Sequence, residues 1–100
     1  MIVSSGSDLQ VFPNPFSSLI KINYTLKEQT NLKLSIYDLN GKLMKTLEDQ
    51  QKPAGIYSKE WNGKSDDNVS LPAGIYLLRM SGRSVTGNTI KSEIKLILNK

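Results

Sequence analysis

The sequence predicts an all-β fold, an antiparallel β-sandwich of about seven strands. Three observations predict it. Apolar and polar residues alternate in several short segments, turn residues separate these segments, and no stretch shows the period of an amphipathic helix. The 100 residues are enough for one domain with its own core. An open barrel is the alternative that the same pattern allows.

The first half of the chain has predicted strands at residues 9–12, 19–26, 32–37 and 43–47. Before the second strand, Pro13-Asn14-Pro15 excludes a helix and most ladder hydrogen bonds, so it predicts a rigid corner where the chain changes sheet. Asn40-Gly41 predicts a hairpin turn in which both residues have positive φ. We expect residues 1–8 to be a flexible segment or linker and residues 48–52 to be a polar loop.

The sequence Pro-Ala-Gly-Ile-Tyr occurs twice, starting at Pro53 and again at Pro72. Proline suits a strand entrance, glycine a tight corner, and the Ile-Tyr pair a pleated surface. The two copies therefore predict equivalent strand entrances, leading into strands 56–61 and 75–80. Strand 75–80 is apolar on both faces until Arg79, which predicts a central strand covered on both sides. A hairpin loop at residues 81–88 and a last strand at 89–99 complete the pattern of an immunoglobulin-like sandwich.

The excess positive charge is concentrated at the C-terminal end of the chain. The net charge is +4, and residues 79–100 account for all of it. The basic residues of this segment are Arg79, Arg83, Lys91, Lys95 and Lys100, and its one acid is Glu93. Two interpretations remain. The lysines discourage aggregation at a solvated sheet edge, or they form a surface that meets an acidic partner.

No group for catalysis or metal binding stands out. The chain has no cysteine and no histidine, which excludes disulfides, thiol nucleophiles and the usual zinc and haem ligands. Asp66, Asp67 and Asn68 are adjacent and do not match the spacing of an EF-hand loop. We expect them to be turn residues rather than a carboxylate pair or a calcium site. We therefore expect no enzyme activity, no catalytic residue, no metal and no cofactor.

Other ligand classes are also disfavoured. The basic C-terminal hairpin has no interleaved aromatic residue, so we expect no nucleic-acid binding. Tyr24, Tyr57, Trp61 and Tyr76 occupy alternating strand positions, which predicts core residues rather than a sugar platform. No apolar run has the length of a transmembrane helix, and residues 1–6 do not have the pattern of a signal peptide.

Three motifs, in this order, resemble those of the type A C-terminal sorting domain of the type IX secretion system. They are Val-Phe-Pro-Asn-Pro-Phe from Val11, Ile-Tyr-Asp-Leu-Asn-Gly from Ile36, and Leu-Pro-Ala-Gly-Ile-Tyr-Leu-Leu-Arg from Leu71. The resemblance covers residues 9–100. Trp61-Asn62-Gly63 also resembles the Ig-like domain of the flagellar hook-cap protein, which has a related sequence pattern.

The resemblance implies a role in protein export. Such domains direct a covalently fused N-terminal cargo from the periplasm of a Gram-negative bacterium through an outer-membrane translocon. The cargo reaches the cell surface or is secreted, and a surface sortase removes the domain. The implied sorting residues are Pro72, Gly74, Tyr76, Gly82, Lys91, Lys95 and Lys100. The first three match a Pro-x-Gly-x-Tyr motif, and the others match a later glycine and spaced lysines, although the gap between Gly82 and Lys91 is longer than in the family.

A sorting domain of this kind needs no catalytic group, and we expect a monomer whose docking surface is the final hairpin, residues 75–100. The partners implied by the resemblance are the translocon and the sortase. The alternative is an Ig-like structural spacer or a carbohydrate-binding accessory module of an extracellular enzyme. The position of this domain in its parent protein distinguishes the two.

Overall fold

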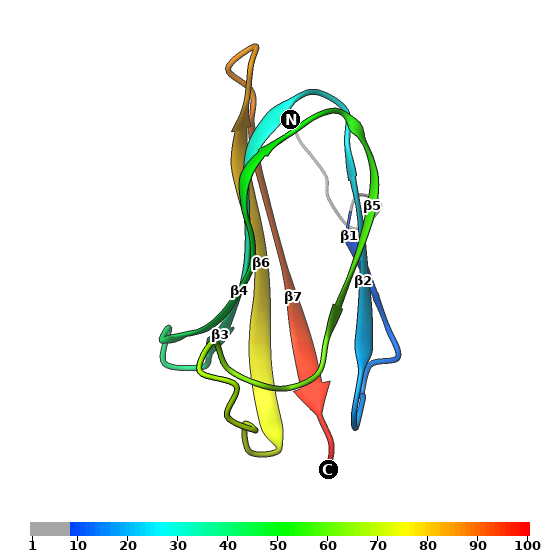
Figure 1. Ribbon diagram of the computed structural model, residues 1–100, viewed down its shortest axis with the longest axis vertical. Helices are drawn as coiled ribbons and strands as arrows, with labels where there is room; N and C mark the ends of the chain where they lie inside the picture. Colours follow the sequence, from blue (N-terminus) through cyan, green and yellow to red (C-terminus); the bar gives the residue numbers. More distant parts are fainter. Residues whose placement is uncertain (1–8) are drawn as a thin grey trace.

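Seven strands make up the fold of residues 9–100, the part of the chain that the computed structural model describes (Figure 1). They are β1 (Leu9–Phe12), β2 (Ile20–Leu26), β3 (Thr30–Asp38), β4 (Leu43–Lys52), β5 (Gly55–Trp61), β6 (Gly74–Ser84) and β7 (Thr89–Leu98). The segment predicted to be a flexible linker, residues 1–8, lies outside the described residues. The described part of the chain contains no helix of the length and apolarity needed to span a bilayer.

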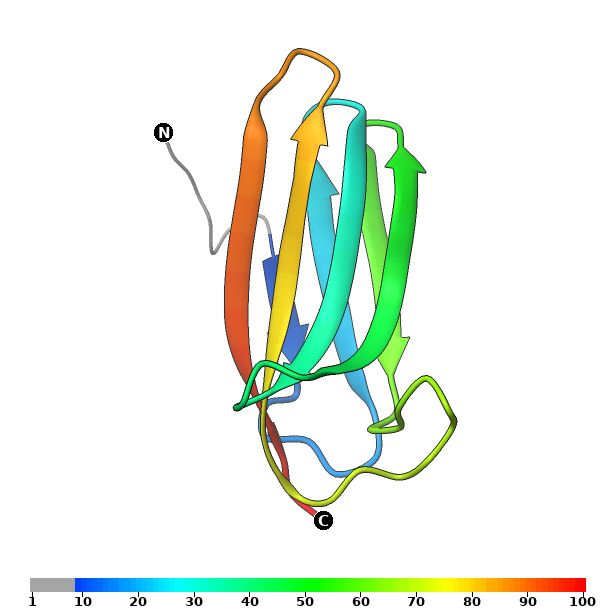
Figure 2. The same ribbon diagram turned by 90° about the vertical axis from the view of Figure 1, so that its left-hand side faces the viewer.

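The strands form two antiparallel sheets that pack face to face, which confirms the predicted sandwich rather than a barrel (Figures 1 and 2). Sheet A has the strand order β1-β2-β5, and sheet B has the order β4-β3-β6-β7. The predicted alternation places every second side chain between the sheets. The fully buried side chains include Ile20, Ile22, Leu32, Leu34, Ile36, Trp61, Leu78, Met80, Leu96 and Leu98.

The Pro13-Asn14-Pro15 corner turns the chain from β1 to the edge of sheet B, as predicted, but only for a single bridge, because the next strand, β2, pairs with β1 in sheet A. Both prolyl peptide bonds are cis. Directly after the corner, Phe16 forms a parallel bridge with Leu98 at the end of β7. The Phe16 N–H donates to the Ile97 carbonyl at 2.9 Å, and the Phe16 carbonyl accepts from the Asn99 N–H at 2.7 Å.

β4 is longer than predicted, because residues 48–52 extend the strand instead of forming a loop. They pair with β3 from Thr30 to Leu34. Polar side chains are tolerated there because β4 is an edge strand. Glu48 points inward and is held by the ammonium groups of Lys59 and Lys52, 3.0 and 3.7 Å from its Oε1. Burial opposes ionisation of Glu48, but hydrogen bonds from Lys59 and Gln50 and the two lysine charges outweigh it and lower the pKa of Glu48.

β6 lies between β3 and β7, so the predicted central position is correct, but the predicted cover on both faces is wrong. Within residues 9–100, no layer lies over the outer face of sheet B (Figure 2). Ile75 on that face is 38% exposed. β6 also runs beyond its predicted end through Gly82 to Ser84.

The hairpin between β3 and β4 also differs from its prediction. Gly41 has positive φ, at 85°, and Asn40 does not. The Asp38 carboxylate accepts the N–H groups of Asn40 and Lys42, each at 2.9 Å, and this side chain organises a longer turn. The pattern Asn-Gly located the hairpin correctly but did not determine its type.

Candidate functional site

The two Pro-Ala-Gly-Ile-Tyr copies form the same corner, which confirms the predicted equivalence. Their glycines begin β5 and β6 with φ angles of 159° and 157°. In the first copy the Tyr57 hydroxyl donates a 2.6 Å hydrogen bond to the Pro53 carbonyl. In the second copy the Tyr76 hydroxyl donates one of the same length to the Pro72 carbonyl. Each tyrosine therefore closes the turn in which its own strand begins.

The second corner is buried more deeply than the first, although both contact the core. Tyr76 is only 5% exposed, and its ring meets Trp61 edge-on, with 5.7 Å between ring centroids. Burial and the charge of Asp38 raise the pKa of Tyr76, which keeps its hydroxyl a donor. Tyr57 is half-buried and stacks on the core residue Tyr24, with 5.2 Å between centroids.

Lys100 joins the second corner from the far end of the chain. Its ammonium group donates a 2.6 Å hydrogen bond to the carbonyl of Leu71, the residue before Pro72. Four of the predicted sorting residues, Pro72, Gly74, Tyr76 and Lys100, thus gather where β6 begins and β7 has ended (Figure 1). This arrangement holds the last residue against the loop that leads into β6.

Gly82 lies in the second half of β6, where β3 approaches closely. A Cβ atom on Gly82 would lie 2.4 Å from the Asn31 carbonyl oxygen and 2.8 Å from Cγ2 of Thr30. No real side chain fits at such distances, so glycine is required for β3 and β6 to pair along their whole length. Its neighbours across the sheet are Leu32 on β3 and Ile90 on β7.

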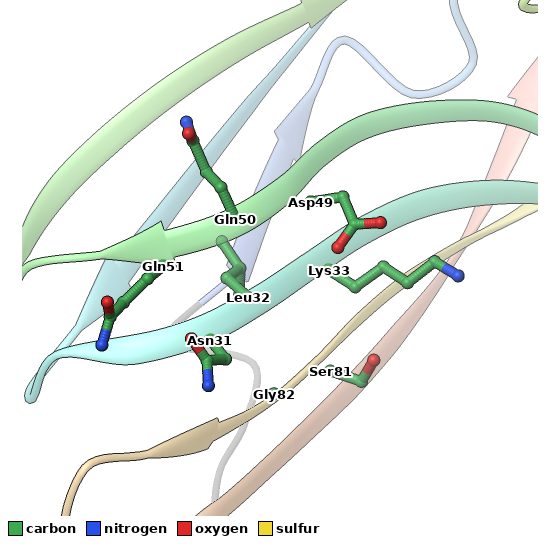
Figure 3. A pocket seen from close by; sticks show the side chains of 8 residues that line it. All are labelled: Asn31, Leu32, Lys33, Asp49, Gln50, Gln51, Ser81 and Gly82. Atoms are coloured by element: carbon green, nitrogen blue, oxygen red, sulfur yellow. The ribbon is translucent and has the colours of Figure 1, made fainter.

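A depression of about 270 Å³ opens near Gly82, between β3, β4 and β6 (Figure 3). Polar side chains from three strands border it, including Asn31, Lys33, Asp49 and Ser81. It is wide and open rather than enclosed, and no aromatic ring borders it. It therefore does not have the enclosed, largely apolar form of a small-molecule site.

The basic residues of the final hairpin divide into bound and unbound groups. Arg79 pairs with Glu93 across the strands, with 2.8 Å between Nη2 and Oε2, and its guanidinium lies 4.7 Å from the centre of the Tyr37 ring. The hydrogen bond to Glu93 raises the pKa of Arg79. By contrast, Arg83, Lys91 and Lys95 form no ion pair within the described range 9–100.

Lys91 and Lys95 project from the exposed outer side of β7. Ser81 lies opposite Lys91 on β6, and Leu77 lies opposite Lys95. These two lysines are therefore available to a partner. Of the other predicted sorting residues, Tyr76 is buried, Gly74 and Gly82 are half-buried, Lys100 binds the Leu71 carbonyl, and Pro72 is exposed. The surface lies at one edge of sheet B (Figure 2).

The tip of this hairpin is tied to the turn between β2 and β3. The Glu28 carboxylate accepts hydrogen bonds from the Thr86 hydroxyl and from the Asn88 amide, the latter at 2.7 Å. These two bonds lower the pKa of Glu28. The backbone N–H of Val85 also donates to the Gln29 carbonyl at 2.9 Å. The β6–β7 hairpin is thus held at both ends.

Two structural side chains were not recognised from the sequence. The Asn14 side-chain amide donates to the Lys95 carbonyl at 2.8 Å and accepts from the Ile97 N–H at 2.9 Å. It thus makes the hydrogen bonds that the backbone of a neighbouring strand would make with the edge of β7. Asp66 does the same on the edge of β4, where its N–H donates to the Met44 carbonyl at 3.0 Å and its carboxylate accepts the Thr46 N–H at 3.2 Å. Turn-forming residue types were visible in the sequence, but their partners lie far along the chain.

The chain matches known proteins at the level of a family and a fold. The family model of the FlgD Ig-like domain matches residues 17–85. No curated protein matches the sequence.

Several solved structures share the fold. Dimeric latent PorU from Porphyromonas gingivalis is 24% identical with a TM-score of 0.70, over 91% of this chain and 9% of PorU. FlgD from P. aeruginosa is 23% identical with a TM-score of 0.60, over 78% of this chain and 60% of FlgD. PorZ from P. gingivalis, described as an essential bacterial surface component of the type IX secretion system, is 17% identical with a TM-score of 0.56, over 94% of this chain and 12% of PorZ.

These likenesses show the sandwich fold, and this chain spans less than an eighth of PorU or PorZ. The family match extends over well more than half of the chain, from the corner after β1 to the end of β6. The chain therefore belongs to the FlgD Ig-like domain family.

Proposed function

We propose that this domain is a C-terminal sorting domain, which directs a cargo protein fused to its N-terminal side through the type IX outer-membrane translocon. The observation that carries the proposal is the exposure of Lys91 and Lys95 on β7, where neither forms an ion pair within residues 9–100. Solvated, unpaired charges on a rigid strand favour recognition by an acidic partner surface.

The sequence motifs and the structural neighbours support the same proposal. The Pro-Asn-Pro corner and the Pro-x-Gly-x-Tyr corner, which resemble the sorting-domain motifs, both build the ends of β6 and β7. PorZ, which shares this fold, is described as a component of the type IX secretion system. The family match ends at residue 85, so β7 and its lysines are features of this chain beyond the matched region.

In this proposal the partners are the translocon and the sortase, and the route leads from the periplasm to the cell surface or the medium. The domain acts by binding and not by chemistry. The sortase removes it after export, on the N-terminal side of the sandwich.

The test is export of a fluorescent reporter fused to residues 1–100 in a bacterium that has this secretion system. The variant is Lys91→Gln/Lys95→Gln. The matched control is Lys21→Gln/Lys27→Gln, which changes two exposed lysines at sheet A. Deletion of β7 is a poorer test because it also removes Leu96 and Leu98 from the core.

We expect the β7 variant to retain its melting temperature and to accumulate in the periplasm, while the control is exported and cleaved like the wild type. Equal export of both folded variants would contradict the proposal. Fractionation of the cells and the mass of the released reporter measure the two steps separately.

A structural spacer is the second candidate, and membership of the FlgD Ig-like family favours it. A spacer needs only a stable sandwich, so export would be indifferent to every exposed lysine. The carbohydrate-binding alternative has less support, because Tyr24, Trp61 and Tyr76 are buried rather than presented on a face.

A further inference from the structure

β7 lies at the edge of sheet B (Figure 2), and among residues 9–100 only one part of its outer edge is hydrogen-bonded. Asn14 and Phe16 bind the backbone of Lys95, Ile97 and Asn99. Alternate residues of a strand direct their N–H and C=O groups to the same side. These bonds therefore identify the odd-numbered residues of β7 as those whose backbone points away from β6.

The same outward orientation extends toward the start of β7, because its register with β6 is unbroken from Thr89 to Leu98. Within the described part of the chain, the outward backbone groups of Lys91 and Glu93 have no hydrogen-bond partner. On β4, Asp66 covers the edge at Met44 and Thr46, and β1 has only four residues. Among residues 9–100, the first half of the β7 edge is thus left open to a further strand.

The side chains along this open edge determine which strand fits. Glu93 is neutralised by Arg79, so the unpaired charges that β7 itself carries on the outer face, among the described residues, are those of Lys91 and Lys95. On the inner side, Ile90 and Ile94 are half-buried and pack against the core. The edge therefore presents two positive charges four residues apart on one face and apolar surface on the other.

We propose that the open edge of β7 binds an extended acidic segment of a partner protein as an additional strand of sheet B. Two carboxylates of that segment, four residues apart, lie opposite Lys91 and Lys95, and an apolar residue between them packs beside Ile94. The spacing holds for either strand direction because cross-strand neighbours share a face. The inference rests on the proposed function, since it names the partner chemistry of the sorting surface.

The charges explain why an acidic segment is favoured over other strands. Edge lysines repel a basic edge, and a neutral edge would remove water from their charges without offering a partner, so both kinds of unspecific pairing are disfavoured. A carboxylate opposite each lysine converts that repulsion into attraction and gives specificity. A second copy of this chain would bring two more unpaired lysines to the same edge.

The test is an NMR titration of the isotope-labelled domain, residues 1–100, with the synthetic peptide Thr-Glu-Val-Thr-Ser-Glu-Val-Thr at concentrations up to millimolar. We expect the amide resonances of Lys91, Glu93 and Lys95 to shift and their hydrogen exchange to slow. The control peptide carries lysine in place of both glutamates and should not bind. Loss of two exposed charge pairs in Lys91→Gln/Lys95→Gln should weaken binding by about 2- to 30-fold.

Two further variants separate charge from backbone. Lys91→Glu/Lys95→Glu should reverse the peptide preference of the domain, so that it binds the lysine peptide and not the glutamate peptide. Lys91→Pro removes an N–H that points away from β6, so it should abolish binding while the melting temperature is retained. If Lys91→Pro unfolds the domain, the peptide preference of Lys91→Glu/Lys95→Glu alone tests the proposal.

The proposal is overturned if the glutamate peptide shifts no β7 amide, if it binds another face, or if the charge exchange fails. It is also overturned if the same amides shift on self-association without peptide. If the peptide binds at β7 but export does not depend on Lys91 and Lys95, the sorting role is refuted and strand addition is not. Lysine-dependent export without peptide binding would refute strand addition alone.

Discussion

The hydroxyl group of Tyr76 tests whether the Pro-x-Gly-x-Tyr corner acts through the fold. Tyr76→Phe removes the 2.6 Å hydrogen bond to the Pro72 carbonyl and leaves the ring in place. An intramolecular hydrogen bond contributes about 0.5–1.5 kcal/mol net, and because the residue is only 5% exposed we expect about 1–1.5 kcal/mol. In a domain of this size that loss lowers the melting temperature by about 4–12 °C.

Tyr57→Phe is the matched control, because the other copy has a bond of the same length to Pro53 in an exposed position. We expect it to cost about 0.5 kcal/mol or less, a fall of about 2–4 °C. Differential scanning calorimetry measures both variants, and the reporter fusion measures their export.

The reasoning is refuted if Tyr76→Phe leaves the melting temperature unchanged, or if Tyr57→Phe costs more. A Tyr76→Phe domain with unchanged stability but lost export would show that a partner contacts the hydroxyl directly. A domain that is less stable and less well exported in proportion would show that the corner acts by supporting β6.

Four other substitutions test the remaining structural roles. Gly82→Ala should lower the free energy of unfolding in urea by about 1–3 kcal/mol, because its methyl group would lie 2.4 Å from a β3 carbonyl oxygen. Asn14→Ala should speed amide exchange at Ile97, whose N–H loses its acceptor. Tyr24→Phe should be neutral or stabilising, because the Tyr24 hydroxyl is buried without a partner in the described structure and burial raises its pKa to about 12. Glu48→Gln should remove stability that the wild type has near neutral pH. Burial raises the pKa of Glu48, but its lysine and glutamine partners outweigh burial and lower the pKa below the unfolded value. The stability that Glu48 contributes is therefore present above the unfolded pKa and is lost as acid protonates the folded carboxylate. The free energy of unfolding, followed across about pH 3–7, measures this contribution.

A control variant or a contrary result tests three of these predictions, those for Gly82, Asn14 and Glu48. Ser81→Ala, beside Gly82 on the outer face, should change stability by less than about 0.5 kcal/mol, and an equal cost for both would contradict the steric argument. Asn14→Asp keeps the acceptor for Ile97 and should protect that amide better than Asn14→Ala does. A Glu48→Gln domain with wild-type stability at every pH would show that the lysines contribute nothing there.

Local chemistry made the two corners predictable from the sequence. A proline that cannot donate, a glycine that permits the turn and a tyrosine four residues after the proline are all that Tyr57 and Tyr76 need, because each bond closes within five residues. The alternation of β2 and β3 was equally visible, since one face of each strand is buried.

The ends of β4 and β6 were not predictable, because tertiary pairing decides them. Residues 48–52 are polar, and they form a strand because Thr30–Leu34 of β3 offers an unpaired backbone beside them. β6 continues through Gly82 because it pairs there with β3. Only glycine allows this pairing, since the β3 backbone lies too close for any side chain.

The same division applies to the candidate site. The excess of basic residues in 79–100 is a property of the sequence alone. Which of these residues remain without an ion pair is decided by the tertiary structure. Glu93 neutralises Arg79 and a backbone carbonyl binds Lys100, whereas Arg83, Lys91 and Lys95 form no ion pair among the described residues.

By itself the sequence determined the sandwich, its two equivalent corners and the basic character of its last strands, because alternation, turn chemistry and charge are local properties. Only the tertiary structure decided that, within residues 9–100, Asn14 and Phe16 close half of the β7 edge and leave the other half open. Those contacts join residues more than 80 positions apart, and no local pattern specifies which backbone groups such distant partners satisfy.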